Sequence, residues 1–361
     1  MHDFVVVGAG PAGSRFARRA AEAGYDVLVF EQGQVGEPLA CSGHVSTDVW
    51  EFTPDGAREA LLQNEISGAR FHRGGPGDEA HPFYKDEVIS NVIDRVGLDR
   101  WLADAAREAG ADLREEHTVV AVEEGRDRVA VTARGPDGTD TYEGRMVAGC
   151  DGPNSRVRSE LGLPEPDELL HGVLGFTDEA DHDDFVDVHL TVPRFFAWRI
   201  PRGEAGVEYG LATPPGDDVR AAFDEFTGDY GAAVTRRCSG LIPIGPPERV
   251  TGRRSFLIGD AAAQTKPFTG GGILYGMTAA DHAAREIDPR EPGTLGDYER
   301  AWRADLRQEI RLGKVVRAGY SLPGPVQEAG LRAFAGEIGV HMDRPTTLFS
   351  TEQLKALFSR S

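Results

Sequence analysis

The pattern of apolar and polar positions predicts an α/β domain at the start of the chain. Residues 4–7 and 27–30 are short, wholly apolar runs, which are typical of strands buried on both faces of a parallel sheet. Between them, residues 11–23 are predicted to form a helix that Gly24 ends. The order strand, helix, strand is therefore expected within the first 31 residues.

A different pattern appears in the middle of the chain, where apolar and polar residues alternate with a period of two. This alternation predicts strands with one buried face, so an antiparallel sheet that roofs a site is expected here. The apolar positions fall into three runs: Val186, Val188, Leu190 and Val192; Phe196, Trp198 and Ile200; Val207, Tyr209 and Leu211.

The remaining patterns predict that the chain leaves the first domain and later returns to it. The predicted elements are a helix over 91–109, strands over 118–122, 129–133, 139–142 and 146–150, a strand over 255–258, a helix from about 273, and further helices after 298. The predicted division is a nucleotide-binding domain over 1–164 and 251–290, an inserted sheet domain over 165–250, and a helical region over 291–361.

Glycines at the G-x-G-x-x-G spacing follow the first predicted strand. Gly8 permits a tight turn, Gly10 lets the backbone approach a pyrophosphate, and Gly13 lets the next helix pack closely on the strand. Glu31 ends the second strand, where a carboxylate can accept hydrogen bonds from a ribose. These features favour a Rossmann-like dinucleotide site over an ordinary glycine-rich turn. Glu31 disfavours NADP, but the motif alone does not separate NAD from FAD.

Charge and composition narrow the possible partners. Acidic residues outnumber basic ones 59 to 39, for a net charge of −20, which disfavours nucleic-acid binding as the function because phosphate contacts need positive surface. The four lysines are outnumbered by arginines, so the composition resembles that of proteins from salt-loving archaea; an acidic protein of a GC-rich genome is the alternative.

The cysteines and the apolar runs predict a cytoplasmic protein. The three cysteines are far apart and odd in number, which suits a reducing compartment without disulfides. The first predicted strand starts close to Met1, so no signal peptide is expected. No apolar run approaches the roughly 20 residues of a membrane span, and no metal site is predicted.

Four segments together resemble the FAD signature of the p-hydroxybenzoate hydroxylase-like flavoprotein superfamily: the glycine motif with Glu31, Arg95, Asp151-Gly152, and Gly259-Asp260. The resemblance implies that FAD is the cofactor and that Asp260 accepts a hydrogen bond from the ribityl chain, a helix cap being the alternative role. The cofactor contacts that it implies are Gly8, Gly10, Ala12, Gly13, Glu31, Gln32, Cys41, Ser42, Arg95, Val119, Asp260, Gly271, Gly272 and Ile273.

A narrower resemblance, to the geranylgeranyl reductase family, covers nearly the whole chain. The segment from Pro193 to Pro201 is similar to that family's P-x-x-Y-x-W-x-F-P motif, and the segment from Lys266 to Ile273 is similar to its P-x-T-G-G-G-I stretch. The loop around Cys41 resembles its cysteine-bearing loop. Three positions depart from the family pattern: Ser42 separates Cys41 from Gly43, Phe196 replaces a tyrosine, and Ile200 replaces a phenylalanine.

This resemblance implies a reductase that saturates C=C bonds of geranylgeranyl chains in archaeal lipids or a related isoprenoid, with hydride from N5 of the reduced flavin. Phe196, Trp198 and Ile200 would contact the substrate in a dry slot. Cys41 is the candidate proton donor and His44 a second one, although Cys41 could be a small buried hydrophobe and His44 a structural hydrogen-bonding residue.

The partners and the alternatives follow from the same motifs. No second G-x-G-x-x-G occurs, so electrons are expected from an external donor, a ferredoxin or NAD(P)H. Membrane contact is expected to be transient. An FAD-dependent aromatic-ring monooxygenase of the same superfamily is the alternative enzyme, and a flavin-bearing electron carrier is the alternative outside catalysis.

Overall fold

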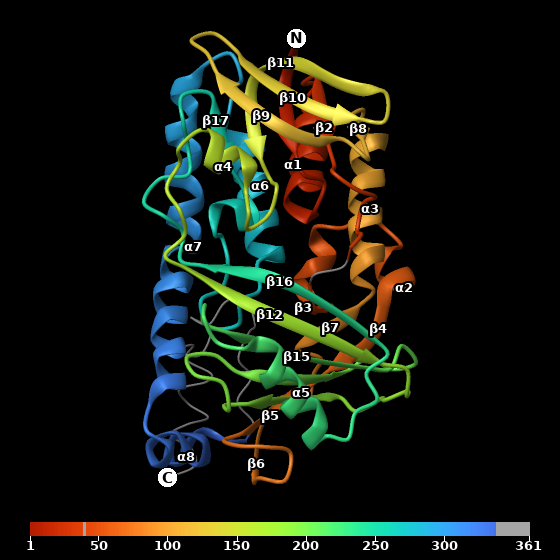
Figure 1. Ribbon diagram of the computed structural model, residues 1–361, viewed down its shortest axis with the longest axis vertical. Coiled ribbons are helices and arrows are strands. Elements are labelled where there is room, and N and C mark those ends of the chain that lie inside the picture. Colours follow the sequence, from red (N-terminus) through yellow and green to blue (C-terminus); the bar gives the residue numbers. More distant parts are fainter. Residues whose placement is uncertain (39–40, 337–361) are drawn as a thin grey trace.

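The computed structural model describes residues 1–38 and 41–336, and its two large sheets lie toward opposite ends of the molecule (Figure 1). The first sheet contains β1 at its centre, paired in parallel with β2 and β11. Its strands, in chain order, are β1 (His2–Val7), β2 (Val27–Phe30), β8 (Asp112–Arg114), β9 (Thr118–Glu124), β10 (Val129–Gly135), β11 (Gly138–Gly149) and β17 (Ser255–Leu257). The predicted strand, helix, strand start is thus confirmed.

Strand β11 differs from the prediction, which had two separate strands over 139–142 and 146–150. It is one strand of 12 residues. Its first half pairs with β10 in antiparallel fashion, and its second half pairs with β1 in parallel. Gly144 lies opposite both neighbours, Val129 and His2. A Cβ on Gly144 would come within 2.8 Å of the Val5 side chain, so the absence of a side chain allows the strand to pass between them.

Four helices pack around the first sheet: α1 (Pro11–Glu22), α3 (Arg95–Glu108), α6 (Ile273–Glu286) and α7 (Leu295–Ala318). Helix α1 contacts both α3 and α6, and α7 contacts α6. The close approach of α6 depends on small residues, because a Cβ on Gly276 would lie 3.3 Å from the Ala12 methyl group. The short helix α4 (Arg156–Glu160) follows β11.

The predicted helix over 91–109 begins later than expected. Asn91, Val92 and Ile93 belong to strand β7 (Ser90–Ile93), and the helix begins at Arg95. Strand β7 lies between β3 (His44–Ser46) and β4 (Leu62–Ile66) in a three-stranded sheet, beside which lies α2 (Ala57–Leu61). The apolar run was assigned to the wrong element because Val92 and Ile93 satisfy a helical spacing as well as a strand.

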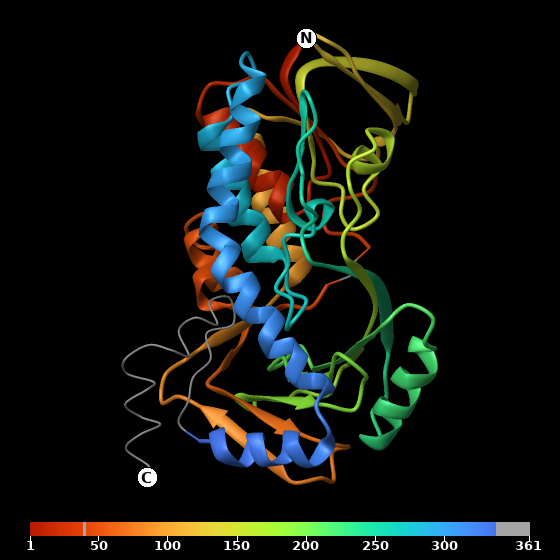
Figure 2. The ribbon, with the colours of Figure 1, turned by 90° about the vertical axis from the view of Figure 1, so that its left-hand side faces the viewer.

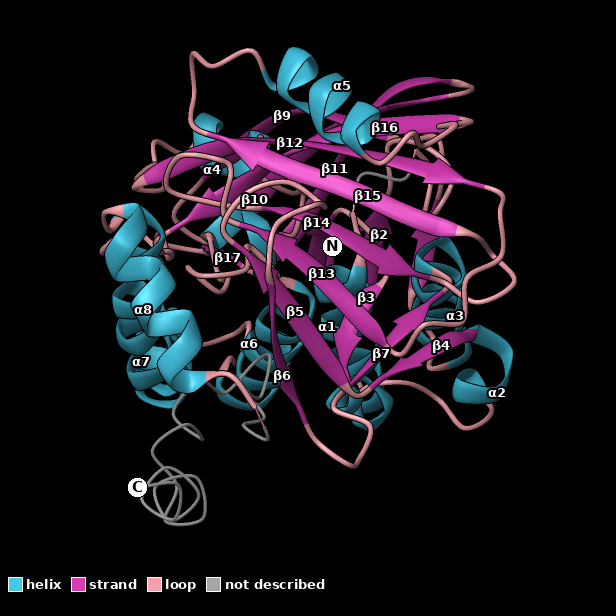
Figure 3. Ribbon diagram, turned by 90° about the horizontal axis from the view of Figure 1, so that it is seen from below, coloured by secondary structure: helices cyan, strands magenta, loops and turns pink. Residues whose placement is uncertain are grey.

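The second sheet corrects the prediction of a purely antiparallel sheet formed within 165–250. Its seven strands include two from earlier in the chain, and β5 pairs in parallel with β13. In spatial order the strands are β16 (Arg236–Ile244), β12 (Glu168–Thr177), β15 (Val207–Thr213), β14 (Ala197–Pro201), β13 (Phe185–His189), β5 (Gly68–His72) and β6 (Ala80–Tyr84). Figure 3 shows this sheet from below, with helix α5 (Val219–Asp229) beside β12, β15 and β16.

The two faces of the second sheet have different partners. Val207, Tyr209 and Leu211 pack with Phe223 and Phe226 of α5. Ala212, which alternates with these residues on β15, and Ile200 of the neighbouring strand β14 belong to a separate apolar cluster on the other face. One face is therefore closed by a helix, and the other faces the rest of the molecule.

Helix α7 is 24 residues long and runs from the first sheet to the second (Figure 2). It is followed by α8 (Gly324–Phe334), which contacts β6. The predicted helical region is thus present as far as it is described, and its last residues, 337–361, lie outside the described part. No helix of the described residues is long and apolar enough to cross a membrane.

Candidate functional site

A cavity of about 500 Å³ lies between the glycine loops of the first sheet and the open face of the second. It is lined by the predicted site residues Gly10, Ala12, Cys41, Ser42, His44, Arg95, Phe196, Trp198, Ile200, Asp260, Gly271, Gly272 and Ile273. Segments more than 200 residues apart in the sequence therefore meet at one site. Gly8, Gly13, Glu31, Gln32 and Val119 are not among its lining residues.

The first glycine loop leaves open space at Gly10, where a phosphate would bind. Gly8 has φ +96°, and a Cβ there would come within 2.4 Å of the Cys150 carbonyl oxygen. A Cβ on Gly13 would lie 2.0 Å from the Gly8 carbonyl oxygen. By contrast, a Cβ on Gly10 would meet no atom within 4 Å. Gly8 and Gly13 are thus required by the fold of the chain, whereas Gly10 faces open space at the start of α1, where backbone N–H groups attract anions.

Glu31 lies directly after β2, beside this loop. Its Oε2 accepts a hydrogen bond of 2.8 Å from the backbone N–H of Ala9. Burial raises the pKa of Glu31, and hydrogen bonds from the backbone of Ala9 and Gly33 oppose that rise. The carboxylate is fixed at the end of the strand, as expected for a ribose acceptor. Gln32 is exposed, and Val119 is buried in the core of the first sheet, where it lies opposite Ala133 of β10.

The second glycine segment begins helix α6. The backbone N–H of Lys266 donates to the Gly271 carbonyl (3.0 Å), which closes the loop over residues 266–271. A Cβ on Gly272 would lie 2.4 Å from Asp260 Oδ1. Helix α6 has Gly272 as its N-cap and no side-chain cap hydrogen bond, so Asp260 does not cap this helix.

Asp260 is a carboxyl group held at the edge of the cavity. Burial raises its pKa to about 6, while the Arg95 guanidinium acts in the opposite direction. Asp151, the other acid of the predicted signature, has a different position: it accepts hydrogen bonds from Ser155 Oγ (2.6 Å) and from the backbone N–H of Arg156 (2.6 Å) and thus stabilises the start of α4. Only Asp260 of these two acids faces the cavity.

Arg95 is buried at the start of α3 and pairs with Asp99 across 2.5 Å. Its Nε is a buried donor without a hydrogen-bond partner among the described residues. Burial alone lowers the pKa of Arg95, but Asp99 and Cys41 raise it above its usual value. A permanent positive charge with an unused donor therefore borders the cavity, as expected for a group that contacts an anionic cofactor.

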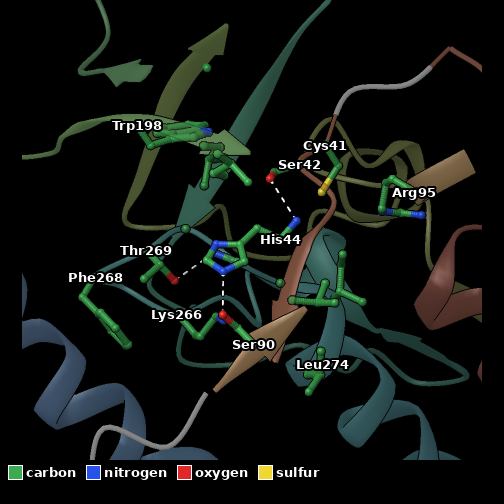
Figure 4. A pocket seen from close by; sticks show the side chains of 18 of the residues that line it. Cys41, Ser42, His44, Ser90, Arg95, Trp198, Lys266, Phe268, Thr269 and Leu274 are labelled. Carbon is green, nitrogen blue, oxygen red and sulfur yellow. Dashed lines mark hydrogen bonds between the residues drawn. The ribbon is translucent and has the colours of Figure 1, made fainter. Parts of the chain in front are cut away.

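Cys41 and His44 lie in the loop before and at the start of β3. Cys41 is half-buried; burial raises the pKa of its thiol above its usual value, and Arg95 offsets part of that rise. His44 Nε2 forms a 2.8 Å hydrogen bond with Ser90 Oγ, and the His44 backbone N–H donates to Ser42 Oγ (Figure 4). The thiol therefore stays protonated at neutral pH, and the imidazole is oriented by its neighbours.

The wall formed by the second sheet is apolar and aromatic. The Phe196 and Trp198 rings meet edge to face with centroids 5.7 Å apart, so the prediction that they share a face is confirmed. Phe195 stacks behind Phe196 with centroids 4.5 Å apart. Tyr320, which follows α7, contacts Phe196 from the other side at 5.7 Å.

Several lining residues were missed by the sequence analysis. Strands β5 and β6 contribute Phe71 and Phe83, β16 contributes Ile242, and the end of α7 contributes Val316. The strict alternation around Val186 and Val188 could have indicated those two as lining residues, since they share the face of Trp198. No comparable pattern marked β5 and β6, which the sequence analysis left in the first domain.

One group of possible metal ligands occurs away from the cavity, in the described part of the chain: Glu79, His81 and Glu328. Arg332 forms hydrogen bonds or ion pairs with Glu79 (2.8 Å) and with Glu328 (2.9 Å). This guanidinium already supplies the positive charge, so the group ties α8 to β6 without need of an ion.

The fold and the cavity define a class of protein, the FAD-dependent oxidoreductases with a two-sheet architecture. A family model described as an FAD binding domain matches residues 62–220, and one described as an NAD(P)-binding Rossmann-like domain matches residues 6–47. The structure superposes on a geranylgeranyl bacteriochlorophyll reductase-like protein from Thermoplasma acidophilum with a TM-score of 0.86, 22% identity, and coverage of 99% of this chain and 96% of that chain. It also superposes on p-nitrophenol 4-monooxygenase from Pseudomonas putida (TM-score 0.75, 16% identity, 100% and 97% coverage).

Sequence similarity then identifies the family. The chain is 32% identical to digeranylgeranylglycerophospholipid reductase 1 of Methanopyrus kandleri over 87% of this chain and 89% of the relative. It is also 32% identical to digeranylgeranylglycerophospholipid reductase 2 of the same organism, over 86% and 84%. The chain belongs to the digeranylgeranylglycerophospholipid reductase family.

Proposed function

We propose that this protein is an FAD-dependent reductase that saturates the C=C bonds of geranylgeranyl chains in archaeal membrane lipids or a related isoprenoid. The observation that carries the proposal is the apolar, aromatic-lined cavity that opens directly onto the glycine loops. Membership of the family favours prenyl reduction over aromatic hydroxylation. The fold alone does not separate the two reactions, since the structure also superposes on a monooxygenase, with a TM-score of 0.75.

The residues of the first sheet fit FAD. The pyrophosphate would pass Gly10, where a Cβ would meet no atom within 4 Å, Glu31 would accept from the ribose, and the buried Arg95 Nε beside the cavity is a donor without a partner among the described residues. Asp260 would accept from the ribityl chain, and Gly271, Gly272 and Ile273 would direct backbone N–H groups at the pyrimidine edge. When bound and reduced, FAD supplies the hydride that an unactivated double bond requires.

The second sheet holds the substrate. Phe196, Trp198 and Ile200 would pack along the prenyl chain, whose burial is favourable by about 0.8 kcal/mol for each CH₂. Holding the chain in one orientation replaces a random encounter by a fixed one, and the apolar lining excludes water from the reacting carbons.

A proton must reach the second alkene carbon, and Cys41 and His44 are the candidates. The thiol of Cys41 has a raised pKa and so carries its proton at neutral pH. His44, hydrogen-bonded to Ser90 Oγ, could restore that proton. Both residues line the cavity; Cys41 lies beside Arg95, and the His44 imidazole lies beside Ser90 (Figure 4).

The electron donor is proposed to be external, either a ferredoxin or NAD(P)H. Rapid mixing of the oxidised holoprotein with NADPH, NADH or a reduced ferredoxin, followed by the absorbance of the flavin near 450 nm, discriminates the donors. Only the true donor should bleach the flavin at a rate that matches turnover.

Transient contact with a membrane surface is proposed at the end of α7 and in α8. Large apolar side chains are exposed there, and residues 316 and 320 of the same segment line the cavity. These exposed side chains are Val315, Leu322, Val326 and Phe334. Flotation with vesicles of neutral and anionic lipid tests the contact; because the net charge is −20, binding to anionic vesicles should increase with salt.

The proposed reaction is tested by anaerobic incubation of the dithionite-reduced holoprotein with a digeranylgeranyl phospholipid. The expected result is a mass gain of about two hydrogens for each reduced bond. Unchanged lipid, at full flavin occupancy, would overturn the proposal. Oxygen consumption with a phenolic substrate and NAD(P)H would indicate the monooxygenase instead.

A further inference from the structure

A fully buried carboxylate lies behind the aromatic wall of the cavity. Glu208 is on β15, directly opposite Ile200 of β14, and has no exposed surface. The residues before and after it, Val207 and Tyr209, belong to the cluster around α5. Alternation therefore directs Glu208 to the cavity face of the sheet, although it does not itself line the cavity.

Glu208 connects the Trp198 indole to the Arg202 guanidinium through hydrogen bonds. The Trp198 indole Nε1 donates to Glu208 Oε1 at 3.0 Å. Arg202 Nη1 donates to Glu208 Oε2 at 3.5 Å, and Arg202 Nη2 donates to Gln63 Oε1 at 2.8 Å. The Arg202 guanidinium also lies over the Phe176 ring, 4.9 Å from its centroid. The indole is thus the end of a chain of hydrogen bonds that runs from the half-buried Gln63 through the buried Arg202 and Glu208.

The other sides of the Trp198 indole are also fixed. Gly210 lies opposite Trp198 in the sheet, and a Cβ there would come within 2.4 Å of the indole, so the ring covers the glycine. Phe196 contacts the indole at its edge. The one polar atom of the indole is held by Glu208, and Trp198 is one of the residues that line the cavity.

We propose that Glu208 is a positioning residue, which fixes the Trp198 indole against the prenyl chain and so determines which double bonds are reduced. This inference rests on the proposed function. A buried ion pair contributes little net stability compared with apolar residues of similar size. The orientation that a carboxylate acceptor imposes on the indole N–H accounts for an acid behind the aromatic wall, since a hydrogen bond to a charged group is stronger than one between neutral groups.

The experiment compares Glu208→Gln, Glu208→Leu and Trp198→Phe holoproteins with the wild type. The readouts are the distribution of partly and fully reduced lipid and the separate values of kcat and KM. Glu208→Gln keeps an acceptor oxygen for the indole, whereas Glu208→Leu removes it. The matched control is Asp187→Asn, because Asp187 of β13 is also a buried carboxylate, it holds His72 of β5 in the same sheet, and it lies outside the cavity lining.

The expected result is a change of about fivefold in the ratio of partly to fully reduced product for Glu208→Leu and for Trp198→Phe, equivalent to about one hydrogen bond. Glu208→Gln should restore most of the wild-type distribution. The double variant Glu208→Leu with Trp198→Phe should add nothing to either single change, because both remove the same contact. Flavin content and Asp187→Asn products should match the wild type.

The inference is overturned if Glu208→Leu leaves the distribution unchanged, if Glu208→Gln alters it as much as Glu208→Leu, or if Asp187→Asn gives the same alteration. The Trp198 indole ¹H signal, assigned with Trp198→Phe, provides a readout that needs no turnover. It should shift in Glu208→Leu and stay near its original position in Glu208→Gln. If the wild type reduces no prenyl lipid, the proposed function fails on its own. The indole signal still tests the positioning role in that case: if it does not shift in Glu208→Leu, the positioning role is contradicted.

Discussion

The two walls of the cavity are built in opposite ways. On the side of the first sheet, exposed backbone and polar side chains form the wall: Gly10, Gly271 and Gly272 leave the main chain open, and Arg95 and Asp260 lie beside them. On the side of the second sheet, apolar and aromatic side chains such as Phe196 and Trp198 form most of the wall. The first wall suits a ligand with phosphates and hydroxyl groups, and the second suits a hydrocarbon chain. Substitutions should therefore separate cofactor binding from substrate binding.

The largest effect is expected at Gly13. In Gly13→Ala the new methyl group would lie 2.0 Å from the Gly8 carbonyl oxygen, so α1 has to move away from β1. We expect loss of bound FAD and a decrease of about 3 kcal/mol in the free energy of unfolding. The measurements are the ratio of absorbance at 450 and 280 nm and denaturant unfolding of the apoprotein.

Gly10→Ala is the matched control for this prediction. Its methyl group would meet no atom within 4 Å, so the apoprotein should unfold as the wild type does, while its affinity for FAD decreases because the methyl group occupies phosphate space. In this division the fold requires Gly13 and the cofactor requires Gly10. If Gly10→Ala and Gly13→Ala lowered the free energy of unfolding equally, the division would be contradicted.

Next in size is Cys41→Ala. If the thiol donates the proton, kcat should decrease by about 100-fold, with flavin content and KM close to those of the wild type. Because the pKa of Cys41 is raised above its ordinary value of 9.0, the wild-type rate should stay level up to about pH 9 and decrease above it. If Cys41→Ala kept the wild-type kcat, another group would be the proton donor. The kcat of His44→Gln is the value to compare in that case.

A smaller effect is expected from Phe196→Leu on the other wall. The substitution keeps an apolar side chain but removes the edge-to-face contact with Trp198, a contact worth about 1 kcal/mol. We expect kcat/KM to decrease by about fivefold to tenfold, with unchanged FAD affinity. A loss of flavin from Phe196→Leu would show that the two walls are not independent.

The smallest effect is expected from Asp260→Asn, and it depends on pH. Asp260 has its pKa raised from 3.8 to about 6, so its ionisation is disfavoured in the folded apoprotein, and stability is lost as the pH rises from about 4 to about 6. Asp260→Asn should therefore make the apoprotein more stable at pH 8, by no more than about 3 kcal/mol, and should leave its stability at pH 3.5 unchanged. Thermal unfolding at both values checks the sign.

The same substitution should weaken FAD binding, since a carboxylate accepts hydrogen bonds from hydroxyl groups more strongly than an amide does. Asp260 would then lower the stability of the apoprotein and strengthen the binding of the cofactor. Tighter FAD binding by Asp260→Asn would remove the proposed role in contacting the ribityl chain.

Much of the cofactor wall could be predicted from the sequence. The glycine spacing after residues 4–7 and the position of Glu31 depend on contacts within 31 residues, and local backbone geometry determines them. The start of α6 at Ile273 could be predicted for the same reason, because Gly270, Gly271 and Gly272 end one element and begin another. The amino-acid sequence determined these features since each arises from neighbours in the chain.

The substrate wall was decided largely by the tertiary structure. Alternation placed Phe196 and Trp198 on one face, but nothing local indicated that β5 would pair with β13 and bring Phe71 into the same cavity. Likewise, Asn91 to Ile93 were predicted as helix, and only pairing with β3 and β4 makes them a strand. Strand pairing between segments that are distant in the sequence depends on the whole fold, because no local pattern specifies which strand edge a segment will pair with.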